Sequence, residues 1–130
     1  YYKHFLQTGL MAMEPQTGSI KAWVGGINYK YFQYDHVAQG ARQVGSTFKP
    51  FLYYAAIENG FTASTTFNSS KTTFVFSNDK TYSPSNFGDI YPNKDITLAA
   101  ALAYSDNVFA VKTHLFLGTN TLTQTIQRKI

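Results

Sequence analysis

The chain has 130 residues, of which 44% are hydrophobic, 17% are aromatic and 14% are charged. This composition suits one domain with a buried core and argues against a disordered chain. The formal net charge is +4 and the 11 basic residues are scattered, which argues against a nucleic-acid-binding surface. Cysteine is absent, which excludes disulfides, thiolate metal sites and a cysteine nucleophile.

The two ends of the chain suggest a piece of a longer protein. The first residue is Tyr1 and no signal peptide opens the chain, while the final run TLTQTIQRKI contains no helix-ending residue. The longest apolar run, Leu98–Tyr104, is too short to span a bilayer. We therefore expect residues 1–130 to be an incomplete domain.

The first third of the chain predicts a β-hairpin followed by a loop. Two apolar runs, Leu10–Met13 and Ile20–Val24, flank the turn-forming residues Glu14–Gly18. In the second run Ile20, Ala22 and Val24 alternate with Lys21 and Trp23. We therefore expect the face that carries Ile20, Ala22 and Val24 to be buried. The polar, aromatic-rich stretch 27–44 predicts a loop, with a short helix within it as the alternative.

Helices dominate the prediction for the rest of the chain. Apolar residues at spacings of three and four predict a helix over Ser46–Asn59, with Gly60 as its cap. A small hairpin is predicted around Ser77–Asp79, and residues 83–94 predict a loop. Three more helices are predicted. The first covers residues 95–104, with Asp95 or Thr97 as its cap. The second runs from about Val108 to Leu117, buries Val108, Val111 and Leu115 and ends at Gly118, and the third begins near Thr121. Strands in front and helices behind favour a mixed α/β class.

Ser46 and Lys49 form a Ser-x-x-Lys pair at the start of the first predicted helix. Residues three apart share one face of a helix, so we expect Lys49 to reach Ser46 Oγ. Pro50 is tolerated only near a first turn, which places the helix start beside Ser46, and Gly45 allows close approach by a ligand. The N–H groups of a helix start favour an oxyanion, and apolar neighbours would lower the pKa of Lys49 so that it can act as a base. The pair therefore suits acyl transfer, whereas the alternative is a helix cap beside a solvated lysine.

Two other patterns need separating from this pair. Ser77–Lys80 has the same spacing but lies in a polar turn without an apolar helix after it, and we interpret it as a chance match. Ser105-Asp106-Asn107 lies at the junction of two predicted helices, which would aim Ser105 and Asn107 into a cleft or use them as helix caps. Asp106 is expected to be a cap or an ion-pair partner rather than a catalyst.

The three histidines predict no metal site. His4, His36 and His114 lack a metal-binding spacing, and we expect them to face solvent or to bond locally. His114 is expected to lie away from the buried face of its helix. The sequence predicts no cofactor and no metal.

The two serine-containing boxes resemble those of the penicillin-binding protein transpeptidase domain, whose signature is Ser-x-x-Lys, then Ser-Asp-Asn, then Lys-Thr-Gly. STFK at Ser46–Lys49 and SDN at Ser105–Asn107 match the first two boxes. The likeness extends through MEPQTGSIKAWVGG, GARQVGSTFKPFLYYAAIENG and SPSNFGDIYPNKDITLAAALAYSDNVFAVK, and it is greatest to the class A, bifunctional members. It implies a partial fold of the penicillin-binding protein and serine β-lactamase type, with antiparallel strands packed on helices and the C-terminal strands missing.

The resemblance also implies a mechanism and a setting. Ser46 would attack the carbonyl between the two terminal D-alanines of a peptidoglycan stem peptide, and Lys49 would take the hydroxyl proton. Ser105 would relay a proton to the leaving amine, Asn107 would hold the substrate amide, and a second stem peptide would resolve the acyl-enzyme. β-Lactams would acylate Ser46. The parent would carry a glycosyltransferase domain and a membrane anchor, and would act on lipid-linked precursor at the extracytoplasmic face of the bacterial membrane.

The chain departs from the family pattern in three places. No Lys-Thr-Gly occurs, since KTT at Lys71–Thr73 and KTH at Lys112–His114 lack the glycine, and the third box would follow Ile130. We therefore expect residues 1–130 to be inactive alone. Val44 stands where the class A members usually have proline, and Tyr34–His36 replaces a usual Phe-Asn-Arg.

Two other functions remain open from the sequence. A serine β-lactamase or a β-lactam sensor would use the same boxes, with a water-activating group in the lactamase. A non-catalytic module would keep the fold to bind wall peptide or a partner protein.

Overall fold

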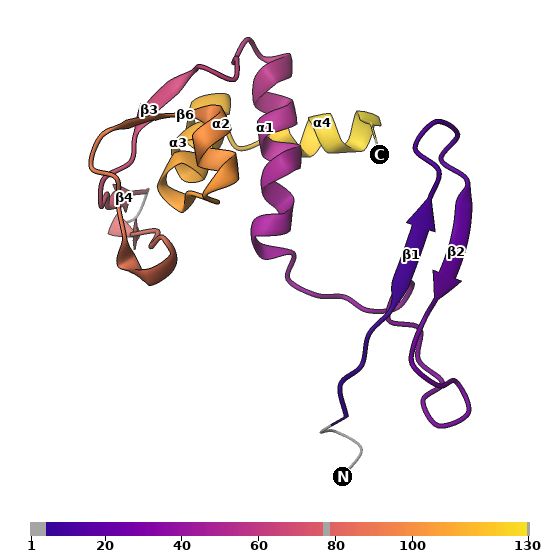
Figure 1. The fold of residues 1–130 in the computed structure, drawn as a ribbon. Coiled ribbons are helices and arrows are strands. Elements are labelled where there is room, and N and C mark those ends of the chain that lie inside the picture. The colour runs from indigo at the N-terminus through magenta and orange to yellow at the C-terminus, as the bar shows by residue number, and fades with distance from the viewer. Residues whose placement is uncertain (1–4, 77–78, 130) are drawn as a thin grey trace. The chain divides into compact units, whose positions relative to one another are not determined.

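The computed structural model describes residues 5–76 and 79–129. They form two compact units that divide between Gln43 and Val44, and each unit is described by itself. Figure 1 shows the elements of both units along the chain. Among the helices of the described residues, none combines the length and the apolar character needed to cross a bilayer.

The first unit contains the predicted hairpin. Strands β1 (Leu10–Met13) and β2 (Ile20–Val24) pair antiparallel, with Leu10 opposite Val24 and a bulge between Ala12 and Met13. The turn between them closes through a hydrogen bond of 2.9 Å from Gly18 N to Glu14 O, and Gly18 has a φ of 72°, which glycine adopts without strain. The hairpin is therefore confirmed at both strands.

The expected buried face of this hairpin is wrong. Every residue of β1 and β2 is exposed, including Ile20 at 53% and Val24 at 50% of their surface. An alternating strand becomes buried only when a second layer covers it, and the described part of this unit has no further helix or strand.

A loop after β2 is organised around Asp35. The Asp35 carboxylate accepts hydrogen bonds from Trp23 Nε1 at 2.7 Å, Val37 N at 2.8 Å and Ala38 N at 3.0 Å. The Ala38 N–H and the Trp23 side chain hold the pKa of Asp35 below its usual range. The aspartate at this position thus ties the loop back to β2.

The second unit begins with two helical segments of different type. A 3-10 helix, Gly45–Phe48, leads into α1 (Lys49–Glu58), so the predicted α-helix starts three residues later than expected. Pro50 has no N–H to donate to Ser46 O, and that carbonyl instead accepts from Lys49 N, three residues on, which is the 3-10 pattern. The helix ends at Glu58, before Gly60 at a φ of 94°.

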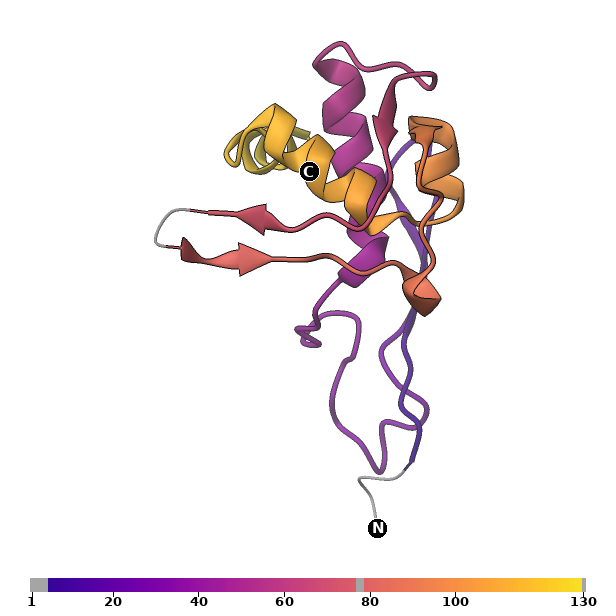
Figure 2. The same cartoon turned by 90° about the vertical axis from the view of Figure 1, so that its left-hand side faces the viewer.

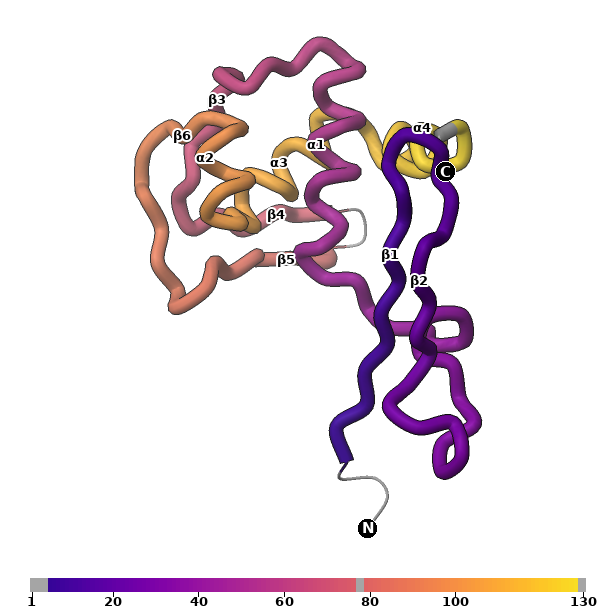
Figure 3. The backbone as a smooth tube through the Cα atoms, turned by 45° about the vertical axis from the view of Figure 1, so that its right-hand side comes forward, coloured from indigo at the N-terminus to yellow at the C-terminus, as the bar shows by residue number. Residues whose placement is uncertain are grey.

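Short strand pairs and three helices complete this unit (Figures 1, 2 and 3). Strand β3 (Thr66–Asn68) pairs antiparallel with β6 (Asp95–Thr97). Strand β4 (Phe74–Val75) pairs antiparallel with β5 (Thr81–Tyr82), which confirms the strands of the second predicted hairpin. Ser77 and Asn78 of its predicted turn lie outside the described residues. The helices that follow are α2 (Leu98–Ala103), α3 (Asn107–Leu117) and α4 (Thr121–Lys129). Thr97, rather than Asp95, caps α2, because its hydroxyl accepts from Ala100 N at 3.2 Å.

The core of the second unit lies between α1, α2 and α3. Its buried members are Leu52, Tyr53, Ala56, Phe61, Leu98, Ala101 and Phe109. Phe109 is completely buried and meets the Tyr53 ring edge-on, with 5.9 Å between centroids, and the Phe67 ring at 5.2 Å. This cluster fixes α3 against α1, and so brings the two serine-containing boxes together.

The buried side of α3 differs from the prediction. Val108 is buried as expected, but the other fully buried residues are Phe109 and Thr113, while Leu115 is 38% exposed. Val111 and Leu115 line an open cavity instead. The reason is that α3 packs with its Phe109 side against both α1 and β3, so the apolar stripe that the spacing picks out is not the side in the core.

Candidate active site

Ser46 and Lys49 lie at the entrance to α1, but no side-chain hydrogen bond joins them. Ser46 is exposed in the 3-10 helix, whereas Lys49, the first residue of α1, is only 8% exposed. No hydrogen bond joins Ser46 Oγ to Lys49 Nζ, so the contact expected from their spacing is not formed in this structure. The Lys49 amine instead forms hydrogen bonds with Ser105 and Asn107 of the second box.

Lys49 Nζ donates three hydrogen bonds to residues of that box. Its acceptors are Ser105 O at 2.5 Å, Ser105 Oγ at 3.0 Å and Asn107 Oδ1 at 2.6 Å. These three acceptors match the three N–H groups of a lysine ammonium. Of the three, only the Ser105 hydroxyl can reverse its role and donate, so it is the partner that can accommodate a neutral amine.

Burial changes the acid–base behaviour of Lys49. Removal of the amine from water lowers the pKa of Lys49, and the negative charge of nearby Asp106 opposes this effect. Burial is the larger influence, so the neutral amine forms more easily here than on a solvated lysine. The structure thus combines a buried amine of lowered pKa with an exposed hydroxyl one turn earlier.

The second box forms a tight turn between α2 and α3. Ser105 has a φ of 54°, a left-handed conformation that is uncommon for residues other than glycine. Asp106 follows as the N-cap of α3, with Oδ1 accepting from Phe109 N at 2.7 Å, which confirms the expectation of a capping role. Asn107 begins α3 and also donates from Nδ2 to Ser85 O at 2.6 Å.

Three residues that contact this turn were not found from the sequence. Ser69 and Asn86 donate to Asp106 Oδ2, Asn86 Oδ1 accepts from Asn107 N, and Ser85 supplies the carbonyl just described. Ser69 directly follows β3, and Ser85 and Asn86 belong to loop 83–94; each lies at least 20 residues before the residue it contacts. No motif or periodicity signals such contacts.

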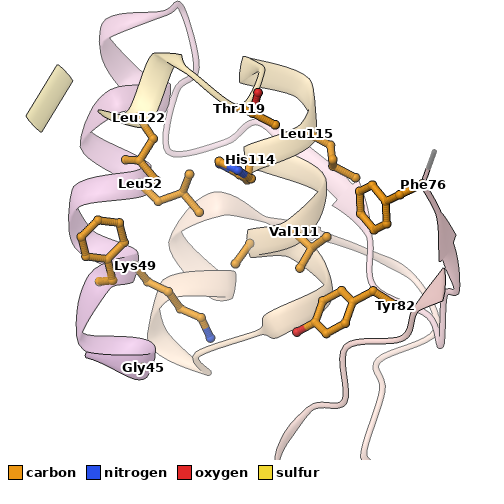
Figure 4. Close-up of a pocket in the computed structure, with 12 residues that line it drawn as sticks. Gly45, Lys49, Leu52, Phe76, Tyr82, Val111, His114, Leu115, Thr119 and Leu122 are labelled. Atoms are coloured by element: carbon orange, nitrogen blue, oxygen red, sulfur yellow. The ribbon is translucent and has the colours of Figure 1, made fainter. Parts of the chain in front are cut away.

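An open cavity of about 500 Å³ lies beside Lys49 (Figure 4). Figure 4 shows the Lys49 side chain extending from α1, with apolar side chains of α1, α3 and α4 and the rings of Phe76 and Tyr82 around the space. His114 also lines the cavity, next to Leu115, so its expected place away from the apolar stripe is wrong. In residues 5–76 and 79–129, no group of three or more metal-ligating side chains comes together.

The chance match at Ser77–Lys80 cannot be placed, because Ser77 lies outside the described residues. Lys80 is described and is exposed. Among the lysines whose burial the structure describes, Lys49 is the one that is buried.

Comparison with known proteins decides the family. The model of the penicillin-binding protein transpeptidase domain matches residues 8–129, which is nearly the whole chain. The chain belongs to this transpeptidase family. The membership predicted from the first two boxes is thereby confirmed.

Individual relatives and a solved structure agree with the family match. The chain is 51% identical over 121 residues to penicillin-binding protein 2D of Bacillus subtilis, covering 92% of this chain and 18% of that protein. It is 37% identical over 125 residues to penicillin-binding protein 1A of Neisseria flavescens, covering 95% of this chain and 16% of that protein. The crystal structure of penicillin-binding protein 1A from Haemophilus influenzae superposes with a TM-score of 0.87 at 30% identity, over 94% of this chain and 18% of that chain.

These comparisons bear on the fold and on the extent of the chain. The superposition confirms the mixed α/β class and the partial transpeptidase fold predicted from the sequence. The chain spans less than a fifth of the length of the transpeptidase relatives named above.

Proposed function

We propose that this chain is part of a serine D,D-transpeptidase that crosslinks peptidoglycan stem peptides. The observation that carries the proposal is the buried Lys49 amine, which bonds Ser105 and Asn107 of the second box while Ser46 stands exposed one turn away. A hydroxyl, a neutral amine and a second hydroxyl in one place are the groups that acyl transfer through a serine ester needs.

In the proposed first step, Ser46 Oγ attacks the carbonyl carbon between the two terminal D-alanines. Neutral Lys49 accepts the hydroxyl proton, a C–O bond forms, and the C–N bond of the peptide breaks. The proton passes from Lys49 Nζ through Ser105 Oγ, at 3.0 Å, to the leaving amine of the last D-alanine. The missing Ser46–Lys49 hydrogen bond is compatible with this step, since catalytic hydrogen bonds are often long without substrate and shorten in the complex.

In the second step, the amino group of another stem peptide attacks the ester carbonyl. Its N–C bond forms, the bond to Ser46 Oγ breaks, and the proton from the amine returns to Ser46 by the same route. Asn107 would hold a substrate amide, because Nδ2 uses one of its two N–H groups on Ser85 O and keeps the other. β-Lactams, whose strained amide imitates the scissile bond, would acylate Ser46 in the same way.

We place residues 1–130 in an incomplete transpeptidase domain of a class A, bifunctional parent. The names of the relatives and the small share of their length that the chain covers support this placement. The parent would carry a glycosyltransferase domain and a membrane anchor, and would act on lipid-linked precursor at the extracytoplasmic face of the membrane. Residues 1–130 alone would not react, because the resemblance assigns the second oxyanion donor and the carboxylate-binding groups to the absent third box.

Labelling with fluorescent penicillin tests the proposal in the full-length protein that contains this segment. We expect covalent labelling of the wild type at Ser46 and none in Ser46→Ala. Ser77→Ala is the matched control, because Ser77 has the same spacing to a lysine, and it should label normally. Labelling that persists in Ser46→Ala would remove the assignment, and an unlabelled wild type would favour a non-catalytic module. Release of the label within milliseconds would indicate a lactamase, whereas a lifetime of hours supports a transpeptidase or a sensor.

A further inference from the structure

Loop 83–94 holds the second box through two of its residues. Asn86 uses both ends of its side-chain amide, since Nδ2 donates to Asp106 Oδ2 at 2.7 Å and Oδ1 accepts from Asn107 N at 2.8 Å. The neighbouring carbonyl of Ser85 accepts from Asn107 Nδ2 at 2.6 Å. We infer that Asn86 is a positioning residue for acyl transfer, holding the turn that carries the acceptors of the Lys49 amine; this inference rests on the proposed function.

The first argument concerns the buried charge of Asp106. This residue is 4% exposed, and its carboxylate accepts from Ser69 Oγ at 2.5 Å, Asn86 Nδ2 at 2.7 Å and Phe109 N at 2.7 Å. A buried carboxylate is stable only when donors satisfy it. Asn86 is one of two side chains that do so, and it belongs to a loop rather than to the helix that Asp106 caps.

The second argument concerns the backbone of Ser105. Its φ of 54° is unfavourable for a residue with a Cβ, and such conformations persist only where the surroundings hold them in place. The next two residues are held by Asn86, through the carboxylate of Asp106 and the backbone N–H of Asn107. Asn86 thus bridges a side chain and a main-chain group of consecutive residues directly after the strained position.

The third argument connects this bridge to the chemistry. All three hydrogen bonds of Lys49 Nζ go to Ser105 or Asn107, and none goes to a residue outside the turn. A shift of the turn therefore moves every partner of the amine together and changes its aim at Ser46. Misplacement of a catalytic group by about 1 Å can cost about 100-fold in rate.

Two substitutions of Asn86 test the role in the full-length protein. Asn86→Ala removes both hydrogen bonds. Asn86→Asp keeps them only while its carboxyl is protonated, because that form donates O–H to Asp106 Oδ2 and still accepts from Asn107 N. When ionised it repels Asp106, and when two carboxylates share a site one of them stays protonated to a higher pH than usual. Four other ionisable groups lie near this network. Asp89 donates its N–H to Asn86 O, and Lys49 reaches the network through Asn107. The Tyr91 hydroxyl interacts with the Asn86 backbone, and Tyr53 lies within the electrostatic influence of Asp106.

The measurement is the rate of penicillin acylation per folded molecule at pH 8 and pH 5, with the folded fraction taken from thermal unfolding at each pH. At pH 8 we expect both variants to react about 100-fold more slowly than wild type. At pH 5 the deficit of Asn86→Asp relative to wild type should shrink to less than about tenfold, while that of Asn86→Ala should not. Asn68→Ala is the control and should match wild type, because it removes an exposed amide at the last residue of β3 whose side chain accepts a hydrogen bond from Ser70 Oγ.

Two outcomes would overturn the inference. One is acylation of both variants within about threefold of wild type at pH 8. The other is a loss that merely follows the loss of folded protein, with no recovery of Asn86→Asp at pH 5, since that is the result expected for a purely structural residue. If the wild type is labelled at Ser46 and Asn86→Ala is acylated as fast as the wild type, only the role of Asn86 is contradicted. If the wild type is not labelled at all, both the proposed function and this role are contradicted.

Discussion

Lys49 Nζ lies 2.6 Å from Oδ1 of Asn107, although 58 residues separate the two in the chain. The contact joins the first turn of α1 to the first residue of α3, and it exists because the aromatic core holds these helices together. It places a buried amine among oxygen acceptors that suit its charged form, while burial favours its neutral form. The balance between these effects governs the predictions for this lysine.

Lys49→Arg should slow acylation by penicillin by at least about 100-fold, because a guanidinium does not release its proton at any pH of the assay. The measurement is the rate of covalent labelling in the full-length protein. Lys71→Arg is the matched control, because that lysine is exposed and forms a surface ion pair with Asp89 at 3.6 Å. Near-normal labelling of Lys49→Arg would contradict a lysine base.

Acylation should rise with pH as the neutral fraction of Lys49 grows, and the midpoint should lie below 10.5, because burial lowers the pKa of this amine. The charge of Asp106 raises the pKa of Lys49, so Asp106→Asn should move the midpoint to lower pH. Asp95→Asn, at an exposed position on β6, should leave it unchanged. An unchanged midpoint in Asp106→Asn would show that this charge does not act on the amine, and a midpoint at higher pH would contradict the expected sign.

Ser105→Gly should be more stable than Ser105→Ala by about 1 kcal/mol, because both lose the hydroxyl but only glycine adopts a φ of 54° without strain. The midpoint of denaturant unfolding measures the difference. At Ser64, which is exposed and has no positive φ, the order should reverse, with alanine the more stable. Equal stability of the two variants at position 105 would mean that the turn relaxes when the hydroxyl is removed.

Phe109→Ala should destabilise the fold by about 3–5 kcal/mol, because a fully buried ring between Tyr53 and Phe67 leaves a cavity. Phe87→Ala removes a ring that is 98% exposed and should change the stability by less than about 0.5 kcal/mol. Denaturant unfolding of both variants gives the comparison. A small effect at Phe109 would mean that the core between α1 and α3 collapses around the missing ring.

The elements that the sequence predicted well are those set by local chemistry. The β1–β2 turn depends on Glu14–Gly18, and the ends of α1 and α3 depend on Gly60 and Gly118, at φ values of 94° and 84°. These residues act on their own neighbours in the chain, so their effect can be seen without the fold. The 3-10 entrance to α1 follows the same logic in hindsight, since Pro50 lacks the N–H that a regular first turn would use.

The predictions that were wrong concern what covers a face. The alternation from Ile20 to Val24 indicated a buried side, yet β2 is exposed in the described unit, because burial needs a second layer and not only a pattern. On α3 the apolar spacing predicted that Leu115 would be buried, but Phe109 is the residue that lies in the core. Which side of a helix is buried depends on its neighbours, and these belong to distant parts of the chain.

The sequence alone determined that Ser46 and Lys49 share one helix entrance and that Ser105–Asn107 stands between two helices, because spacing along a helix and turn chemistry act over a few residues. The tertiary structure decided which partners Lys49 takes, which way its pKa moves, and that Asn86 and Ser69 bind Asp106. Desolvation and contacts between remote segments arise only when the chain packs, and no local pattern of residues encodes them.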